Sequence, residues 1–283
     1  MLHNSIQFEK YTALGNDYLV ISNPNVSLTS LQIANICDRR FGVGADGILV
    51  NRRPMSRSPH RVQIFNSDGS ECERSGNGLR IFSQWLLDNE FGDSSGFLVE
   101  CPAGVSEVEV EADGALTLSM GTPKFDASAV GLTDRLTDCR GYTLDVSAGP
   151  LDVTSVSVGN PHTVVFTTLR PDIRQGLGHE IATHDRFDAG TNVQFVTGID
   201  DQGIDIEIWE RGSGRTLTSG SSSCAAAVAV AERGITKFPM SVRMSGGSIS
   251  VARRGTEIWQ TGRAHYVFSG SFPHSETDKV AQT

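Results

Sequence analysis

The feature that most constrains this chain is an internal repeat whose two copies lie 144 residues apart, from Gly15 to Gly159. The matching pairs are GNDYLV at 15–20 with GNPHTV at 159–164, IFN at 64–66 with IWE at 208–210, and SGNG at 75–78 with SGSS at 219–222. A fourth pair, IANICDRRF and HEIATHDRF, has a slip of two residues. One offset shared by separated pairs indicates two copies of one folding unit, since chance likeness between glycine-rich turns would scatter the offsets.

Within each copy, alternating apolar residues predict mainly strands, followed by a glycine-rich loop and one helix. In the first copy the predicted strands are 8–13, 18–22, 47–51, 61–66, 95–101, 105–112 and 115–120, and the predicted helix is 79–89. In the second copy they are 154–158, 163–167, 192–197, 204–209, 240–244, 248–253 and 256–262, with a helix over 223–232. The pattern predicts an N-terminal domain over 1–121 and a C-terminal domain over 122–265. The C-terminal strand, about 266–283, is expected to pack on the first domain, and its last nine residues to fray.

Charge and cysteine usage limit the partners and the compartment. The formal net charge of −9 disfavours nucleic acid and anionic membranes, which bind basic surfaces. The opening residues carry no signal-peptide pattern, and the longest apolar run, Cys224–Ala231, is too short to span a membrane. Five cysteines without a C-x-x-C pair indicate reduced thiols and no zinc site. We therefore expect a soluble cytoplasmic protein without a metal.

One glycine motif suggests a nucleotide-binding loop, but its position between predicted elements argues against that function. Gly42, Gly44 and Gly47 match the spacing of a dinucleotide-binding loop, G-x-G-x-x-G. That loop should follow a strand and open a helix. Here it follows a helix-like segment and leads into a strand-like one, so nucleotide binding is not expected at this place. No G-x-S-x-G elbow of a serine hydrolase stands at a predicted strand-to-helix turn either.

Ser75 and Ser219 lie in equivalent glycine-flanked turns just before a helix. Backbone N–H groups at Gly76 and Gly220 can come close to a ligand, and the positive helix ends favour a carboxylate. A carboxylate held by both helices would place its α-carbon between two side chains, which suits inversion by removal and return of a proton. The two serines can equally be simple N-caps, which serine favours.

These segments resemble the diaminopimelate epimerase family, and the match runs nearly the whole chain. The segments that carry it are KYTALGNDYLVIS, FGVGADG, FNSDGSE with SGNGLR, SMGTPKF, SVGNPH, TNVQF and ERGSGRTLTSGS. The resemblance implies an α+β fold of two pseudo-symmetric domains, each a curled, mainly antiparallel sheet around a central helix. It also implies an isomerase of amino-acid metabolism and lysine biosynthesis that uses no cofactor, takes a small-molecule amino acid or related carboxylate, and forms a homodimer.

The resemblance also assigns site residues. Ser75 and Ser219 occupy the positions of the family's acid and base. The substrate cleft is expected to be lined by Asn16, Asn66, Asn160, Asn192, Glu210 and Arg211, with His162 in the GNPH turn. Backbone N–H groups for the reacting carboxylate are expected from Gly76, Asn77, Gly220 and Ser221.

The chain departs from the family at the chemistry, because the family has cysteine where Ser75 and Ser219 stand. A thiol has a pKa near 8.5, whereas a serine hydroxyl is several units less acidic and needs a neighbouring base. Cys72 lies in the same loop, but the offset pairs it with a threonine, so it cannot supply a two-faced pair. Gly47 is a second departure, since many members carry a polar residue there near the substrate.

Several interpretations of the serine pair stay open. The chain is a natural serine-type branch with an altered substrate, rate or reaction, an engineered double Cys-to-Ser epimerase, or an inactive homologue that binds an amino acid or carboxylate. The serines that surround Ser219 in SGSSSC favour natural divergence, since a designed change would leave the neighbours alone. A lyase or double-bond isomerase, which needs one base only, is a further alternative. We expect a cofactor-independent epimerase or isomerase at an amino-acid α-carbon, with Cys72 and His162 as helpers.

Overall fold

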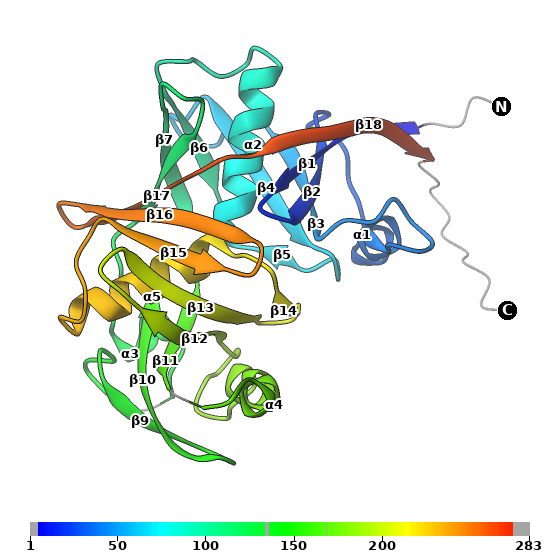
Figure 1. Cartoon of the computed structure of the whole chain (residues 1–283). Coiled ribbons are helices and arrows are strands. Elements are labelled where there is room, and N and C mark those ends of the chain that lie inside the picture. The colour runs from blue at the N-terminus through cyan, green and yellow to red at the C-terminus, as the bar shows by residue number, and fades with distance from the viewer. Residues whose placement is uncertain (1–4, 134–135, 168, 274–283) are drawn as a thin grey trace, which may run out of the picture.

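The computed structural model describes residues 5–133, 136–167 and 169–273 and shows two halves, one above the other in Figure 1. The first half contains β1 (Ser5–Ala13), β2 (Asn16–Ile21), α1 (Ser30–Cys37), β3 (Gly47–Arg52), β4 (His60–Asn66), β5 (Glu71–Cys72), α2 (Gly76–Asp88), β6 (Phe97–Cys101), β7 (Gly104–Val110) and β8 (Leu116–Gly121). The second contains α3 (Ala127–Val130), β9 (Tyr142–Val146), β10 (Gly149–Ser157), β11 (Pro161–Phe166), α4 (Pro171–Ala182), β12 (Asn192–Ile199), β13 (Gly203–Glu210), β14 (Gly214–Thr216), α5 (Gly220–Glu232), β15 (Met240–Met244), β16 (Gly247–Arg254) and β17 (Glu257–Gly262). The last strand is β18 (His265–Pro273).

The two halves repeat one order of strand pairing. β2 pairs in parallel with β3, which pairs antiparallel with β4, and β11, β12 and β13 do the same. β4 then runs parallel to β6, as β13 does to β15, and each series ends in an antiparallel three-stranded run. Most of these pairings are antiparallel. The predicted α+β fold of two homologous, mainly antiparallel units is confirmed.

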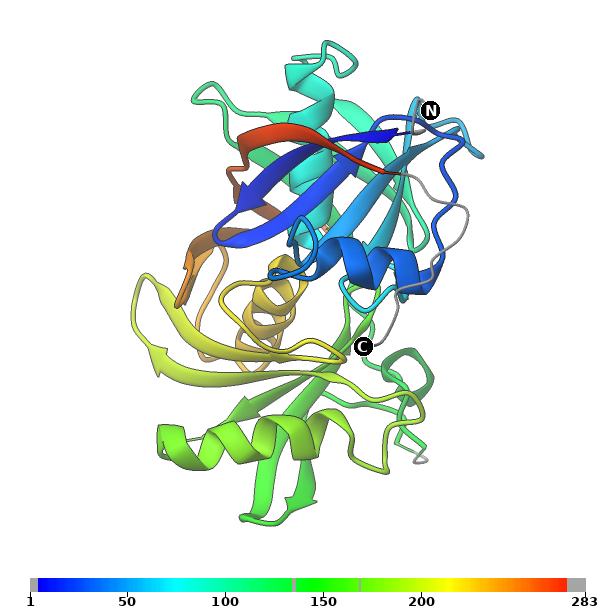
Figure 2. The ribbon, with the colours of Figure 1, turned by 90° about the vertical axis from the view of Figure 1, so that its right-hand side faces the viewer.

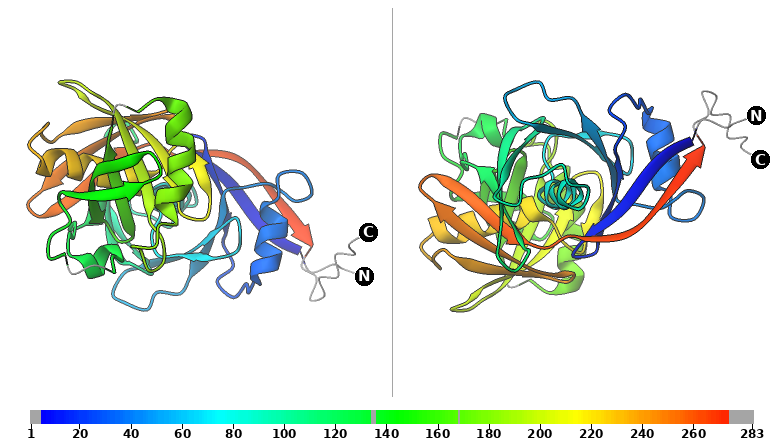
Figure 3. Two further views of the ribbon diagram at one scale, coloured as in Figure 1. Left: turned by 90° about the horizontal axis from the view of Figure 1, so that it is seen from below. Right: turned by 90° about the horizontal axis from the view of Figure 1, so that it is seen from above.

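A long helix fills the centre of each half. α2 contributes Leu79, Phe82 and Trp85 to one apolar core, and in the view from above it lies inside a ring of strands (Figure 3). α5 is buried on every side from Gly220 to Val230, mostly through alanine and valine. A helix that is apolar all round belongs in a core, and small side chains let the surrounding strands approach closely.

Both central helices begin earlier than the sequence pattern predicted, at Gly76 and Gly220 instead of Leu79 and Ser223. Apolar periodicity cannot detect a first turn made of glycine, asparagine and serine. The N-cap hydroxyls set the true start, since Ser75 Oγ accepts from the Gly78 N–H at 3.0 Å.

Two strand pairs cross between the halves. β17, from the C-terminal half, pairs antiparallel with β8, and β18 runs antiparallel along β1 from Ser5 to Thr12. Figure 2 shows β18 beside β1 in the upper half. The predicted domain limits at 121 and 265 remain a prediction, and the last nine residues, expected to fray, lie outside the described residues.

The rejected glycine motif has the element order that the sequence indicated. α1 precedes Gly42-x-Gly44-x-x-Gly47 and β3 begins at Gly47. The loop therefore leads from a helix into a strand, the reverse of the order a dinucleotide-binding loop requires. In the described part of the chain, none of the helices has the length and apolarity to cross a bilayer.

Candidate active site

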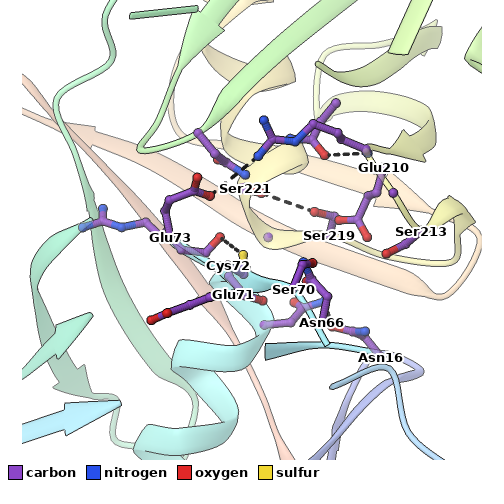
Figure 4. Close-up of a pocket in the computed structure, with 18 of the residues that line it drawn as sticks. Asn16, Asn66, Ser70, Glu71, Cys72, Glu73, Glu210, Ser213, Ser219 and Ser221 are labelled. Carbon is purple, nitrogen blue, oxygen red and sulfur yellow. Dashed lines mark hydrogen bonds and ion pairs between the residues drawn. The ribbon is translucent and has the colours of Figure 1, made fainter. Parts of the chain in front are cut away.

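A cavity of about 370 Å³ lies between the two halves, at the N-terminal ends of α2 and α5. Figure 4 shows that Asn16, Asn66 and the loop around Cys72 enter it from the first half, and Glu210, Ser213, Ser219 and Ser221 from the second. The residues that line it are Asn16, Tyr18, Asn66, Asp68, Ser70, Glu71, Cys72, Glu73, Arg74, Ser75, Asn77, Asn160, Ala189, Asn192, Glu210, Arg211, Gly212, Ser213, Ser219, Gly220 and Ser221. Most of the residues assigned from the sequence are therefore brought together.

The two central helices almost touch at their N-terminal ends. A Cβ on Gly220 would lie only 2.9 Å from Gly76 Cα, and one on either glycine would meet the Gln260 amide. Only glycine permits this approach, which points two sets of unpaired backbone N–H groups at one place. Both helix dipoles then favour an anion there, which suits a substrate carboxylate.

A buried guanidinium adds to this positive potential. Arg80 on α2 is fully buried, and its Nη2 donates to Asn77 Oδ1 at 3.2 Å and to Gln260 Oε1 at 3.0 Å. Among the described residues its Nε and Nη1 atoms find no hydrogen-bond acceptor. Burial lowers the pKa of Arg80 to about 10, which still leaves the side chain cationic at neutral pH.

On the first-half side, Ser75 is held by two neighbours. Its Oγ accepts from the Gly78 N–H and lies 3.3 Å from the Tyr18 hydroxyl. On this side Asn77 Nδ2 donates to Asn16 Oδ1 at 3.2 Å, and Asn16 Nδ2 donates to Asp46 at 2.8 Å. These amide contacts fix the polar wall beside Ser75.

On the second-half side, Ser219 is buried beside a carboxylate. Its hydroxyl lies 3.4 Å from Ser221 Oγ and accepts from the Ser222 N–H at 3.4 Å, and the Glu210 carboxylate lies near it in the same cavity. Burial raises the pKa of Glu210 to about 6, while the nearby Ser219 and Thr216 hydroxyls oppose the rise. A carboxylate that titrates near neutrality beside a serine can take the proton of that serine.

The far end of the cavity holds charges of both signs. The Arg211 guanidinium lies 3.7 Å from the exposed Glu73 carboxylate, and the Arg211 backbone N–H donates to Asn192 Oδ1 at 3.0 Å. Asn160 lines the same wall. Amide, guanidinium and carboxylate groups together can bind a second amino-acid end of a substrate.

Two assigned residues, His162 and Gly76, do not line the cavity. His162 on β11 is fully buried, with Nε2 2.9 Å from Asn160 Oδ1 and Nδ1 3.0 Å from Gln194 Nε2. Burial lowers the pKa of His162 to about 3, so the imidazole is neutral and donates from Nε2 to Asn160. His162 orients a cavity residue and does not reach the cavity itself.

Cys72 lines the cavity but is a poor acid or base. Its thiol donates to the Arg74 carbonyl at 3.2 Å, and burial raises its pKa to about 12. A thiolate is therefore scarce near neutral pH. Cys72 does not replace the missing cysteine pair.

The sequence did not assign a role to several cavity residues, among them Tyr18, Arg74 and Glu73. Glu73 and Arg74 adjoin Ser75 in the chain, and Tyr18 lies within the repeat motif at 15–20, so these positions were the available signals. Gly47 also finds its reason here, since a Cβ there would lie 2.2 Å from the Phe65 carbonyl oxygen and 2.6 Å from the Tyr18 ring. Within the described ranges no group of three or more His, Cys, Asp or Glu side chains is arranged to hold a metal.

Comparison with known proteins places this site in a family. The family model for diaminopimelate epimerase matches residues 8–125 and 154–267, one segment in each half. The chain belongs to the diaminopimelate epimerase family. It is 36% identical to a diaminopimelate epimerase of Nitrosospira multiformis over 94% of this chain and 97% of that one. It is 39% identical to diaminopimelate epimerase 2 of a Nostoc species over 87% and 88%. This family member is therefore an amino-acid epimerase.

Solved structures extend the likeness of fold. A probable proline racemase of Agrobacterium radiobacter superposes with a TM-score of 0.72 at 14% identity, covering 97% of this chain and 94% of that one. A hydroxyproline epimerase of Agrobacterium vitis gives 0.69 at 14% identity, covering 95% and 92%. At such identities the likeness concerns the fold alone.

Proposed function

We propose that this family member inverts the α-carbon of an amino acid with two distal charged groups, with LL-diaminopimelate to meso-diaminopimelate as the nearest named reaction. The observation that carries the proposal is the Glu210 carboxylate, which lies near Ser219 in the cavity that Ser75 also lines, where two helix N-termini meet. It supplies the neighbouring base that a serine needs. The curated relatives at 32–39% identity carry the name of this activity.

In the proposed reaction the substrate carboxylate lies on the N–H groups of α2 and α5, near Gly76 and Gly220. The Cα–H bond breaks as Ser219 Oγ takes the proton and passes its own proton to Glu210. The electron pair moves onto the carboxylate as an enolate, which the helix ends stabilise. Ser75 then gives its hydroxyl proton to the opposite face of Cα, and exchange with solvent resets both side chains.

The distal end of the substrate is assigned to the opposite end of the cavity. Arg211 is proposed to bind a distal carboxylate and Glu73 a distal ammonium group, with Asn66, Asn160 and Asn192 as hydrogen-bonding partners. The guanidinium of Arg211 and the carboxylate of Glu73, 3.7 Å apart on one wall, support a substrate that is itself an amino acid at both ends.

We further infer a cytoplasmic homodimer that serves lysine biosynthesis. Tyr266, Val267 and Phe268 on β18 are 51%, 48% and 41% exposed, which is an apolar run unusual for a free surface. Such an exposed apolar strand suits contact with a second copy. Sedimentation analysis of the intact protein checks this, with a mass near twice 30.4 kDa expected.

Proton NMR in D2O tests the activity, by following loss of the α-proton of LL-diaminopimelate and of a panel of amino acids. Ser75→Ala and Ser219→Ala are each expected to slow exchange-coupled inversion by about 10²-fold or more. The double cysteine variant, Ser75→Cys with Ser219→Cys, is the matched control for an intact cleft. Unchanged activity in the double alanine variant would contradict the assignment, and silence of the unaltered protein beside an active double cysteine variant would indicate a binding role.

A further inference from the structure

We propose that Tyr18 is a positioning residue that helps Ser75 deliver a proton when the epimer whose α-proton faces Ser219 and Glu210 reacts; from the other epimer the same steps run in reverse. The inference rests on the proposed function and adds a direction to it. It is carried by a contact that the sequence repeat does not share between its two copies.

The Tyr18 side chain is fixed against Ser75. Tyr18 lies on β2, paired in parallel with Gly47 on β3, and is 5% exposed. Its ring fills the space that a side chain at 47 would need, since a Cβ there would lie 2.6 Å from the ring. The phenol oxygen then lies 3.3 Å from Ser75 Oγ, at the edge of the cavity that Tyr18 also lines.

In the proposal the phenol is the donor in its contact with Ser75, whose geometry allows either hydroxyl to donate. Burial and the nearby carboxylates of Glu210 and Asp46 raise the pKa of Tyr18 far above its usual range, so the hydroxyl keeps its proton. Ser75 Oγ then receives two donors, the Tyr18 O–H and the Gly78 N–H. Its own hydrogen remains free to point into the cavity. When this proton is transferred to the substrate, the same two donors stabilise the negative charge left on Ser75 Oγ.

The second copy has no equivalent of this arrangement. The position that corresponds to Tyr18 is His162, which bonds Asn160 and Gln194. Ser219 instead lies near Glu210, an acceptor. In the first copy the counterpart of Glu210 is Asn66, whose amide cannot take a proton near neutral pH. The two serines therefore have partners of opposite character.

This asymmetry predicts which half of the reaction depends on Tyr18. Removal of the α-proton breaks the Cα–H bond and moves that proton to Ser219 Oγ. The hydroxyl proton of Ser219 moves to Glu210 in the same step. Return of a proton breaks the Ser75 O–H bond and leaves an alkoxide, which the Tyr18 hydroxyl stabilises. Without that hydroxyl, proton removal at the Ser219 face should continue, and solvent deuterium should return from the same face without inversion.

The test compares Tyr18→Phe with the unaltered protein in D2O, starting from LL- and from meso-diaminopimelate. α-Proton exchange and inversion are measured in the same samples by NMR and chiral chromatography. Tyr18→Phe is expected to slow inversion by about 10²-fold. Exchange from one of the two epimers should stay within about threefold of the unaltered protein, so the ratio of exchange to inversion rises for that epimer.

Tyr11→Phe is the matched control, because Tyr11 is buried in the same half and donates to Asp88 Oδ2 at 2.9 Å, away from the cavity. It should leave the ratio unchanged. Equal losses of exchange and inversion in Tyr18→Phe, from both epimers, would overturn the inference, as would no loss at all. Absence of exchange by the unaltered protein would overturn the proposed function and the inference with it. Inversion with an unaltered ratio in Tyr18→Phe overturns the inference alone.

Discussion

At the scale of single residues, the proposed reaction needs a base beside Ser219, because the resemblance places hydroxyls where the family has thiols. Serine does not ionise near neutrality, so the proposed proton acceptor is another group. Glu210 is the candidate because it lies near Ser219 in the cavity and burial raises its pKa to about 6. Cys72 does not, because burial raises its pKa to about 12.

Glu210→Gln should therefore abolish most of the activity, by about 10²- to 10⁴-fold in kcat. Only the ionised carboxylate accepts a proton, so in the unaltered protein kcat should rise between pH 5 and 7 with a midpoint near 6. Steady-state rates over this pH range provide the measurement. Glu73→Gln, at an exposed carboxylate of the same cavity, is the control and should change KM and leave the midpoint in place. A Glu210→Gln variant with the same pH profile would contradict the role.

At the level of secondary-structure elements, the close approach of α2 and α5 is what forms the proposed carboxylate site. Two helix N-termini can share one anion only if their first turns carry no side chain at the contact. Gly76 and Gly220 meet that condition, and Gln260 closes the gap between them. The helices are positioned by their cores, so the approach depends on packing far from the site.

Gly220→Ala should push the two helix ends apart. The new Cβ would lie 2.5 Å from Gln260 Oε1 and 2.9 Å from Gly76 Cα, so neighbours must move. We expect a loss of about 1–3 kcal/mol in the free energy of unfolding. A shift of about 1 Å at the carboxylate site should lower kcat about 10²-fold. Urea unfolding and the NMR assay measure the two effects.

The control for that change is Gly176→Ala on α4, where the added Cβ meets no atom within 4 Å. It should stabilise the protein by about 0.5–1 kcal/mol, since alanine loses less backbone entropy in a helix. Equal effects of the two substitutions would show that the contact between α2 and α5 tolerates a side chain at position 220.

At the scale of the whole molecule, the last described strand, β18, adds to the sheet of the first half. β18 pairs with β1, and Phe272 lies in one apolar core with Ile6 and Phe8, its ring 5.9 Å from that of Phe8. β17 joins β8 in the same way. The two halves are therefore held together by backbone hydrogen bonds as well as by the site between them.

Phe272→Ala should destabilise the first half by about 3–5 kcal/mol, because it leaves a cavity in that core. Thermal and urea unfolding of the full chain measure the loss. Ser269→Ala, at an exposed position of the same strand, should change stability by less than about 0.5 kcal/mol. A similar small effect at Phe272 would mean that β18 contributes little to the core.

The sequence alone determined the duplication, most strands, both central helices and the family, because these depend on local periodicity and on motifs a few residues long. It also assigned most of the residues that line the cavity, since the motifs carry them. Only the tertiary structure decided that Tyr18 meets Ser75, that Glu210 lies near Ser219 and that His162 is buried. The first contact joins residues far apart in the chain, and all three depend on how strands pair and helices pack. Equivalent positions in a repeat can therefore have different neighbours, which a shared offset cannot reveal.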